Sequence, residues 1–317
     1  MKYYLFFFLL VTHALQAQSF ERHYFKENGE ETLNPDIAQF FRDYSIKDRK
    51  LFHFVQYAMN GVRECEGDTP FITPLTLEGK YIVYDSNQTI REETEYKNGQ
   101  PEGLQKKYYS NSKLEEVGYW VKDGNAEDEK GRYATSYHIE SYLDTTGRAV
   151  VEKGTGPCSR WNEAEELIEE GVYLNGLKDG VWEGYPSEQS IIFYNETYEK
   201  GVLKHGMSYD ALANSYPYTK LDEEAVFTGK EKTLESFLLR AFNKSMIIRK
   251  RSFTGEIIVS CLIDIKGDIA EVQIPHVHDG SLRDEIIRIM NKMSGKWQAA
   301  KHRGQYITTQ FHMPIRL

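Results

Sequence analysis

The chain of 317 residues has a formal net charge of −9 at pH 7 and contains 22 tyrosines, 16 phenylalanines and 24 glycines. Its acidic balance gives no basis for binding nucleic acid or an anionic membrane surface. The length suffices for two domains, and the many aromatic residues among frequent glycines favour antiparallel β-hairpins over helix bundles.

The first 17 residues are typical of a secretory signal peptide. Lys2 precedes an apolar run over residues 3–11, and Leu15-Gln16-Ala17 is a suitable cleavage sequence before Gln18. The apolar run is shorter than the roughly 20 residues that span a bilayer, so an uncleaved anchor is the less favoured alternative. We therefore expect export to the periplasm or cell envelope of a Gram-negative-type bacterium, with no transmembrane helix in the mature chain.

Two short helices are predicted in the first two thirds of the chain. Residues 35–50 carry apolar side chains at helical spacing. These side chains are Ile37, Phe40, Phe41 and Tyr44. The second helix is predicted over residues 163–170, where Gly171 would end it and the acidic residues would form a solvated face.

Two segments of the middle region share one pattern. Residues 95–104 and 172–181 both contain Tyr-x-Asn-Gly-x-x-acid-Gly-apolar. Asn-Gly supports the positive φ angles of a tight hairpin turn, and the second glycine would let the chain bend back into the next strand. Weaker copies of the turn occur at Asn28-Gly29, Asn60-Gly61, Asp123-Gly124 and Lys200-Gly201.

This pattern resembles MORN-type repeats, of the kind also seen in proteins labelled as toxin–antitoxin components. The resemblance implies β-hairpin units of about 20–25 residues that stack into an elongated sheet over residues 18–211. The period is interrupted at Asn111-Ser112, at residues 144–147 and at Gly154-Thr155-Gly156. The last of these is interpreted as a turn rather than a phosphate-binding loop.

Three cysteines follow the signal sequence. An exported protein permits a disulfide. Cys261 lies on the apolar face of a predicted strand, so we expect a buried thiol there. Cys65 and Cys158 are both expected in loops, where a bridge between them and two separate thiols are equally open.

The last third of the chain alternates between strand and helix signals. A helix is predicted over residues 233–245. Apolar residues then alternate along a strand from Gly255 to Ile265, and Lys266-Gly267-Asp268 supplies the turn into a returning strand over Ile269–Ile274.

A second helix and a final strand complete this region. Ser281 with Asp284 is interpreted as a capping box that opens the helix. Its apolar face consists of Leu282, Ile286, Ile289, Met290 and Met293. A single strand is predicted from Tyr306 to Leu317. Its apolar side consists of Ile307, Thr309, Phe311, Met313 and Ile315.

Four motifs occur here in an order known from one family. They are Gly255–Val259, Asp264–Ile269, Gly295–Ala300 with Trp297 inside it, and Phe311–Leu317. Together they resemble the C-terminal domain of TonB energy transducers. The resemblance implies a small α/β-sandwich over residues 225–317, in the order helix-strand-strand-helix-strand, after a linker over residues 212–224. The whole chain is thus predicted to have an α+β fold, with antiparallel β-hairpin repeats before this domain.

The sequence carries no recognisable catalytic motif. It has no nucleophile elbow, phosphate-binding loop, zincin helix or Cys-x-x-Cys, so we expect neither an enzyme nor a cofactor. His276 and His278 are the best candidate metal ligands. Two ligands do not make a site, so no metal is predicted.

The resemblance instead implies a function in binding another protein. In the TonB family the last strand pairs with an extended segment of an outer-membrane receptor, which is β-augmentation. Here we expect a transport-associated periplasmic interaction module that pairs with an envelope or outer-membrane partner. The predicted contacts are the outward residues of the last strand, Tyr306, Thr308, Gln310 and His312. A TonB transducer also has a proline-rich spacer and an uncleaved anchor, neither of which we expect here.

One alternative function stays open. The aromatic repeat sheet could hold glycans or lipids, as an envelope binding protein or an enzyme. The residues that could stack on such ligands are Trp120, Trp161 and Trp182. Tryptophan in a hairpin array is more often part of the core.

Overall fold

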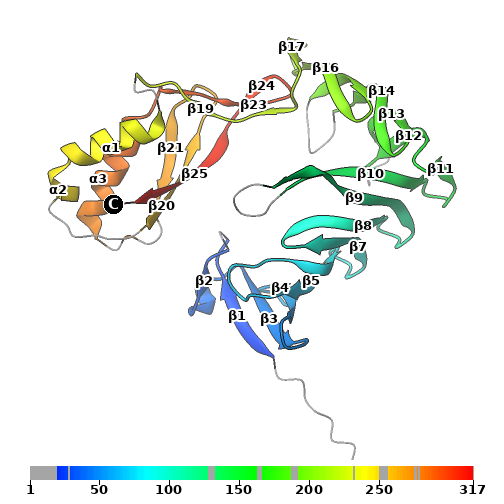
Figure 1. The fold of residues 1–317 in the computed structure, drawn as a ribbon, viewed down its shortest axis with the longest axis horizontal. Helices are drawn as coiled ribbons and strands as arrows, with labels where there is room; N and C mark the ends of the chain where they lie inside the picture. Colours follow the sequence, from blue (N-terminus) through cyan, green and yellow to red (C-terminus); the bar gives the residue numbers. More distant parts are fainter. Residues whose placement is uncertain are drawn as a thin grey trace, which may run out of the picture. The chain divides into compact units, whose positions relative to one another are not determined.

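The computed structural model describes residues 20–27, 29–127, 133–162, 166–186, 192–230, 233–249, 256–274, 277 and 279–316. The predicted signal sequence and both histidines of the candidate metal pair, His276 and His278, lie outside these residues. The fold is rich in antiparallel β-strands, with three α-helices near the C-terminus among the described residues (Figure 1). No described helix is both long enough and apolar enough to cross a membrane.

The chain forms two compact units. The first comprises the described residues up to Gly156 together with Tyr173–Leu177, and the second comprises Pro157–Val172 and the chain from Lys178 onward. The residues expected as a linker, 212–224, contain strand β17 (Ser215–Tyr218) and strand β18 (Asp222–Glu223). The two compact units therefore differ from the repeat region and the C-terminal domain expected from the sequence, which stay predictions.

An antiparallel sheet dominates the first unit. Its strands are β1 (Glu21–Phe25), β2 (Glu31–Thr32), β3 (Phe40–Ile46), β4 (Phe52–Ala58), β5 (Arg63–Thr69), β6 (Glu78–Tyr84), β7 (Ile90–Lys97), β8 (Gln100–Tyr108), β9 (Leu114–Glu127), β10 (Tyr133–Leu143) and β11 (Ala149–Glu152). From β11 down to β3 each strand pairs with its neighbour in sequence, and β1 and β2 follow at the other edge. The sheet is thus a chain of successive hairpins (Figure 1).

A second sheet continues this meander. Its strands are β12 (Gly156–Trp161), β13 (Leu167–Leu174), β14 (Leu177–Gly184), β15 (Phe193–Glu199), β16 (Val202–Tyr209) and β17, in that spatial order. The helix predicted over residues 163–170 is therefore wrong where the structure describes it, because β13 begins at Leu167. Residues 163–165 lie outside the described part of the chain.

The two turns with the full pattern are confirmed, whereas Asp123-Gly124, predicted as a weaker copy, lies inside β9 rather than at a turn. Asn98 and Gly99 have φ angles of 50° and 77°, and Asn175 and Gly176 have 52° and 85°. Each pair forms a two-residue turn between adjacent strands. The expectation for the second glycine is wrong, because Gly103 lies inside β8 with a φ of 112°. A Cβ there would lie 2.3 Å from a carboxylate oxygen of Glu95.

Loops at other hairpins are closed by an aspartate. Its carboxylate accepts backbone N–H bonds of 2.8–3.0 Å from the residues two and four positions later. The four aspartates are Asp85, Asp144, Asp210 and Asp264. Hydrogen bonds, chiefly from Thr89, Thr146, Asn214 and Asp268 respectively, lower the pKa of these carboxyls. The same loop chemistry therefore recurs across the chain.

Aromatic rings lie over glycines of the neighbouring strand. A Cβ added at Gly171 would lie 2.2 Å from the Trp182 ring, and one at Gly184 would lie 1.9 Å from the Tyr194 ring. Equivalent pairs are Gly67 with Tyr81, Gly118 with Tyr137, and Gly206 with Tyr218. Because glycine has no side chain, an aromatic ring of the next strand can pack directly on its backbone. The frequent glycines and aromatic residues therefore pack together in pairs.

The helix predicted over residues 35–50 is wrong. Only a 3₁₀ turn, η1 (Pro35–Ile37), is helical, and strand β3 follows. Phe41 is buried, and its ring stacks on Tyr57 of β4 with centroids 5.1 Å apart. Pairing of β3 with two neighbouring strands therefore outweighs the helical spacing of its apolar residues.

The cysteines are buried in strands. Cys261 is a buried thiol in strand β20 (Glu256–Ile263), as predicted. Cys65 in β5 and Cys158 in β12 are also buried thiols, so the predicted loop positions are wrong and the structure contains no bridge between them. Burial raises the pKa of the Cys65 thiol and that of Cys261, the latter to about 11.

Helices cover the C-terminal sheet. This sheet has the order β21 (Ile269–Gln273), β20 and β25 (Thr309–Arg316). The predicted helix over residues 233–245 is α1 (Leu234–Lys244), capped by Thr233, and α2 (Met246–Arg249) follows. The second predicted helix is α3 (Gly280–Asn291), but Asp279 caps it by accepting the Leu282 N–H at 3.1 Å. The predicted Ser281–Asp284 capping box is thus wrong.

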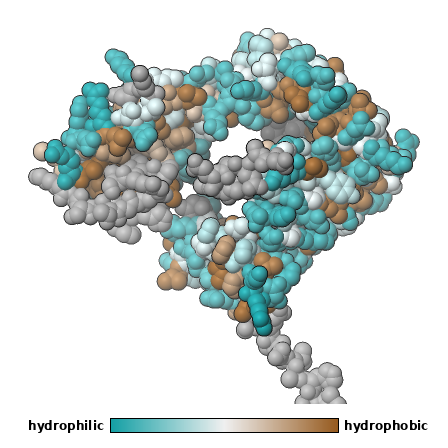
Figure 2. Space-filling model, in the orientation of Figure 1, coloured by the Kyte–Doolittle hydropathy of each residue, from teal (hydrophilic) through white to brown (hydrophobic). Residues whose placement is uncertain are grey.

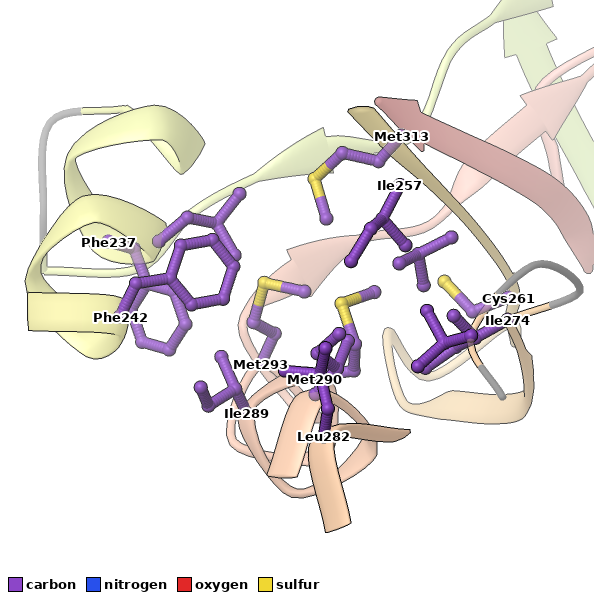
Figure 3. Close-up of a cluster of buried hydrophobic side chains, with 14 of the residues drawn as sticks. Phe237, Phe242, Ile257, Cys261, Ile274, Leu282, Ile289, Met290, Met293 and Met313 are labelled. Carbon is purple, nitrogen blue, oxygen red and sulfur yellow. The ribbon is translucent and has the colours of Figure 1, made fainter. Parts of the chain in front are cut away.

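The core lies between this sheet and the helices (Figure 3). The sheet contributes Ile257, Val259, Cys261, Ile263 and Met313, and the helical region contributes Phe237, Leu238, Phe242, Leu282, Ile286, Ile289, Met290 and Met293. Each fully buried side chain of this size contributes about 1.5–3 kcal/mol. Burial of this apolar face fixes which side of β25 points inward.

Short strands connect the core to the rest of the second unit. Strand β19 (Val226–Phe227) pairs with β22 (Trp297–Gln298). Strand β23 (Ala300–His302) lies between β18 and β24 (Gln305–Ile307). The β23–β24 hairpin comes directly before β25 in the chain.

Candidate functional site

Strand β25 is the edge of the C-terminal sheet. It pairs with β20 over eight residue pairs, from Ile263↔Thr309 to Glu256↔Arg316, without a register shift. In the described part of the chain no strand lies on its other side. A row of backbone N–H and C=O groups along that side is therefore available for pairing.

Proline in this strand identifies which backbone groups face outward. Pro314 has no N–H, so a strand accommodates it only where the N–H would point away from the partner strand. Because backbone groups alternate in direction along an antiparallel strand, Gln310 and His312 face the same way as Pro314. The open edge thus offers two N–H donors, at Gln310 and His312, and three carbonyl acceptors that include Pro314.

Side chains of β25 alternate as well. Gln310 and His312 are exposed, whereas Met313 is buried in the core. Phe311 is half-buried, and its ring lies against Trp297 with centroids 4.9 Å apart. Phe311 and Met313 therefore hold the strand against the core, while the side chains of Gln310 and His312 and the unpaired backbone edge stay accessible.

The opposite edge of the sheet is irregular. In β21 Glu271 has a φ of 49°, and the register against β20 shifts between Ser260 and Leu262. A charged residue at a bulge interferes with the addition of another strand. Of the two edges, β25 is the one suited to pairing.

The structure brings together two of the four predicted contact residues. Gln310 and His312 lie on β25. Tyr306 lies on β24, where it pairs with Lys301, and the Lys301 ammonium is 5.2 Å from the centre of the Tyr306 ring. Thr308 connects the two strands, so the single strand predicted from Tyr306 to Leu317 is wrong.

A cluster around Arg303 was not found from the sequence. Arg303 and Gly304 form the two-residue turn of the β23–β24 hairpin, with φ angles of 48° and 77°. Arg303 Nε donates to Glu196 Oε1 at 2.8 Å, and the Glu196 side chain is fully buried. The hydroxyls of Tyr198 and Tyr218 donate to the same carboxylate at 3.0 and 2.8 Å.

Ring contacts complete this cluster. The Arg303 guanidinium carbon lies 3.7 Å from the centre of the Tyr194 ring, and the Tyr194 hydroxyl donates to Glu169 at 3.0 Å. Burial opposes the charge of Arg303, but Tyr194 and Glu196 outweigh it and raise the pKa of Arg303. Burial, with the Glu196 charge, raises the pKa of Tyr198. The guanidinium therefore stays charged inside the sheet.

The tryptophans differ in their accessibility. Trp182 is fully buried, and its indole N–H donates to the Val172 carbonyl at 3.1 Å. Trp120 is half-buried and donates to Gln105 at 3.0 Å. Trp161 is 52% exposed. Only Trp161 of the three could therefore offer a ring face to a ligand without rearrangement.

The face drawn in Figure 2 is mostly hydrophilic, with apolar residues scattered between polar ones. Within the described residues, no group of three or more histidine, cysteine, aspartate or glutamate side chains has a geometry suited to a metal ion. The edge of β25 is thus the most clearly defined candidate site.

Neither a family model nor a curated protein matches this sequence.

Proposed function

We propose that the chain is an exported, TonB-like interaction module that binds an extended segment of an envelope or outer-membrane protein along β25. The observation that carries this proposal is the regular, unbulged edge of β25, opposite the bulged edge of β21. The motifs around α3 and the last strand support the TonB-like assignment, and the Asn-Gly turns support MORN-like repeats before it.

The backbone of β25 specifies how a partner would pair. A partner strand would accept hydrogen bonds from the N–H groups of Gln310 and His312 and donate to the carbonyls on the same side. Pro314 has no N–H to donate to a partner strand. Pairing with the partner is therefore strongest over the roughly four residues before Pro314. The exposed side chains of Gln310 and His312 would then contact the partner's side chains.

This proposal is tested by proline substitution with a matched control. Gln310→Pro removes an outward N–H and breaks no hydrogen bond to β20, whereas Gln310→Ala removes only the side chain. Both proteins, immobilised, are incubated with envelope extract. We expect wild type and Gln310→Ala to retain the same outer-membrane protein and Gln310→Pro to lose it. Retention by a correctly folded Gln310→Pro variant would contradict the proposal.

The alternative of a glycan or lipid ligand has less support. Burial of Trp182 removes one of its three proposed stacking residues. This alternative predicts that oligosaccharides shift the tryptophan fluorescence of the protein and that Trp161→Ala abolishes the shift.

A further inference from the structure

The Arg303 side chain links the β23–β24 hairpin to a second sheet. We define the Arg303 lock as the side chains of Arg303, Glu196, Tyr194, Tyr198 and Tyr218. Arg303 belongs to the hairpin before β25, and the other four belong to β15 and β17 of the six-stranded sheet. The lock therefore joins two sheets of the second unit through side chains far apart in sequence.

The backbone of the hairpin tip contacts the same sheet and the segment that follows β17. Ser208 Oγ donates to the Arg303 carbonyl at 2.7 Å, and the Arg303 N–H donates to the Leu221 carbonyl at 2.7 Å. A Cβ at Gly304 would lie 3.1 Å from the Pro217 carbonyl oxygen. The left-handed φ and this close approach both favour glycine at the turn.

The charged groups of the Arg303–Glu196 pair are largely buried. Glu196 has no exposed side-chain surface, and Arg303 has 18%. Removing one partner of such a pair leaves the other charge buried without compensation, which is strongly unfavourable. The adjacent His302–Asp222 pair, which contacts Arg303 through His302 Nε2 and Arg303 Nη1 at 2.9 Å, is more exposed and contributes less.

The hairpin is directly connected to the docking strand. Thr308 alone separates Ile307, the last residue of β24, from Thr309, the first residue of β25. Whatever fixes the hairpin therefore fixes the beginning of β25. Along the chain, a force applied to β25 reaches the six-stranded sheet first through Gln305, whose side-chain amide donates to Ser208 Oγ at 2.9 Å, and then through the Arg303 lock.

We infer that the Arg303 lock is a mechanical coupling, which ties strand β25 to the six-stranded sheet so that the two move and open together. The idea that a partner applies the load rests on the proposed function. The coupling itself does not, because it is a property of the isolated protein.

Hydrogen–deuterium exchange of the full chain, resolved to single residues and without any partner, tests this inference. In Arg303→Met we expect the amides of Phe311 and Met313 in β25, and those of β15 and β16, to exchange on the order of 100-fold faster. The amides of α3 should keep their protection. The control is Arg22→Met, which breaks the Arg22–Asp43 pair between β1 and β3 of the first unit and should leave β25 and β15 unchanged.

The charge pair is tested by a double-mutant cycle. Arg303→Met combined with Glu196→Gln buries no lone charge, so we expect protection to recover partly relative to Arg303→Met alone. Arg303→Lys, which keeps the charge, should lose less protection than Arg303→Met. Unchanged exchange of β25 in a folded Arg303→Met protein, or strictly additive effects in the cycle, would overturn the coupling whether or not a partner binds.

Discussion

At the scale of single residues, buried carboxylates show how this acidic chain places charge inside its fold. Glu196 accepts from an arginine and two tyrosine hydroxyls. Glu116 is also buried, and the Tyr137 hydroxyl donates to it at 2.7 Å. A buried carboxylate is stable only when such donors replace water. The abundant tyrosines therefore serve as hydrogen-bond donors as well as apolar surface.

Glu285 gives a pH-dependent prediction at this scale. The hydrogen bond from Arg288 lowers the pKa of Glu285 from 4.5 to about 2 in the folded chain. A lowered folded-state pKa stabilises the protein above about pH 4.5, and this stabilisation is lost as the pH falls toward 2. Because Arg288 is 52% exposed, solvent screening limits the effect to about 1 kcal/mol or less.

Urea unfolding of wild type and Glu285→Gln between pH 6 and pH 3 measures this effect. Wild type should be more stable at pH 6, and the difference should shrink as the pH is lowered. A difference that is constant over this range would show that the ion pair does not stabilise the fold.

Contact between rings and glycines gives a second prediction. Gly171→Ala places a methyl group against the Trp182 ring, and the overpacking should cost about 1–3 kcal/mol. Gly180→Ala is the control, since a Cβ there meets nothing within 4 Å and only the positive φ opposes it. Calorimetry should give the lower Tm for Gly171→Ala. Equal Tm values for that variant and wild type would contradict close packing of the Trp182 ring on Gly171.

At the scale of elements, local signals predicted more of this structure than long-range ones. The turns at Asn98-Gly99 and Asn175-Gly176 follow from the preference of these residues for positive φ. Helices α1 and α3 follow from apolar periodicity. The helix predicted over residues 35–50 failed because the spacing of a few aromatic residues fits a helix as well as a strand, and pairing with distant strands decides between them.

The candidate site was predicted only in part for the same reason. Gln310 and His312 follow from alternation along one strand. The division at Thr308 depends on pairing of β24 with β23, which alternation does not reveal. Arg303 and Glu196 lie 107 positions apart, so no local pattern connects them. An Arg-Gly pair between alternating segments was the available signal for the turn, and the alternation of Tyr194, Glu196 and Tyr198 was the signal for a buried carboxylate.

The edge of β25 gives the prediction that belongs to this scale. Outward N–H groups of Gln310 and His312 should exchange rapidly with solvent, whereas the inward N–H groups of Phe311 and Met313 should be protected by β20. Residue-resolved hydrogen exchange of wild type measures the alternation. Protection at all four positions would mean that another strand already covers this edge.

At the scale of the whole molecule, the second unit combines the proposed docking edge with a sheet that anchors it. The six-stranded sheet holds the Arg303 hairpin, and that hairpin leads into β25. This contact fixes the position at which β25, the edge strand of the C-terminal sheet, begins. If β25 binds a partner as proposed, the hairpins of the six-stranded sheet support the docking strand.

Site-specific photo-crosslinking in cells tests the central claim most directly. A benzophenone side chain is introduced at residue 312 on the β25 edge or, as the control, at residue 271 on the bulged β21 edge. We predict an adduct with an envelope protein from position 312, its loss when Gln310→Pro is added, and no such adduct from position 271. Equal adducts from both positions, or an adduct that survives Gln310→Pro, would contradict strand pairing along β25.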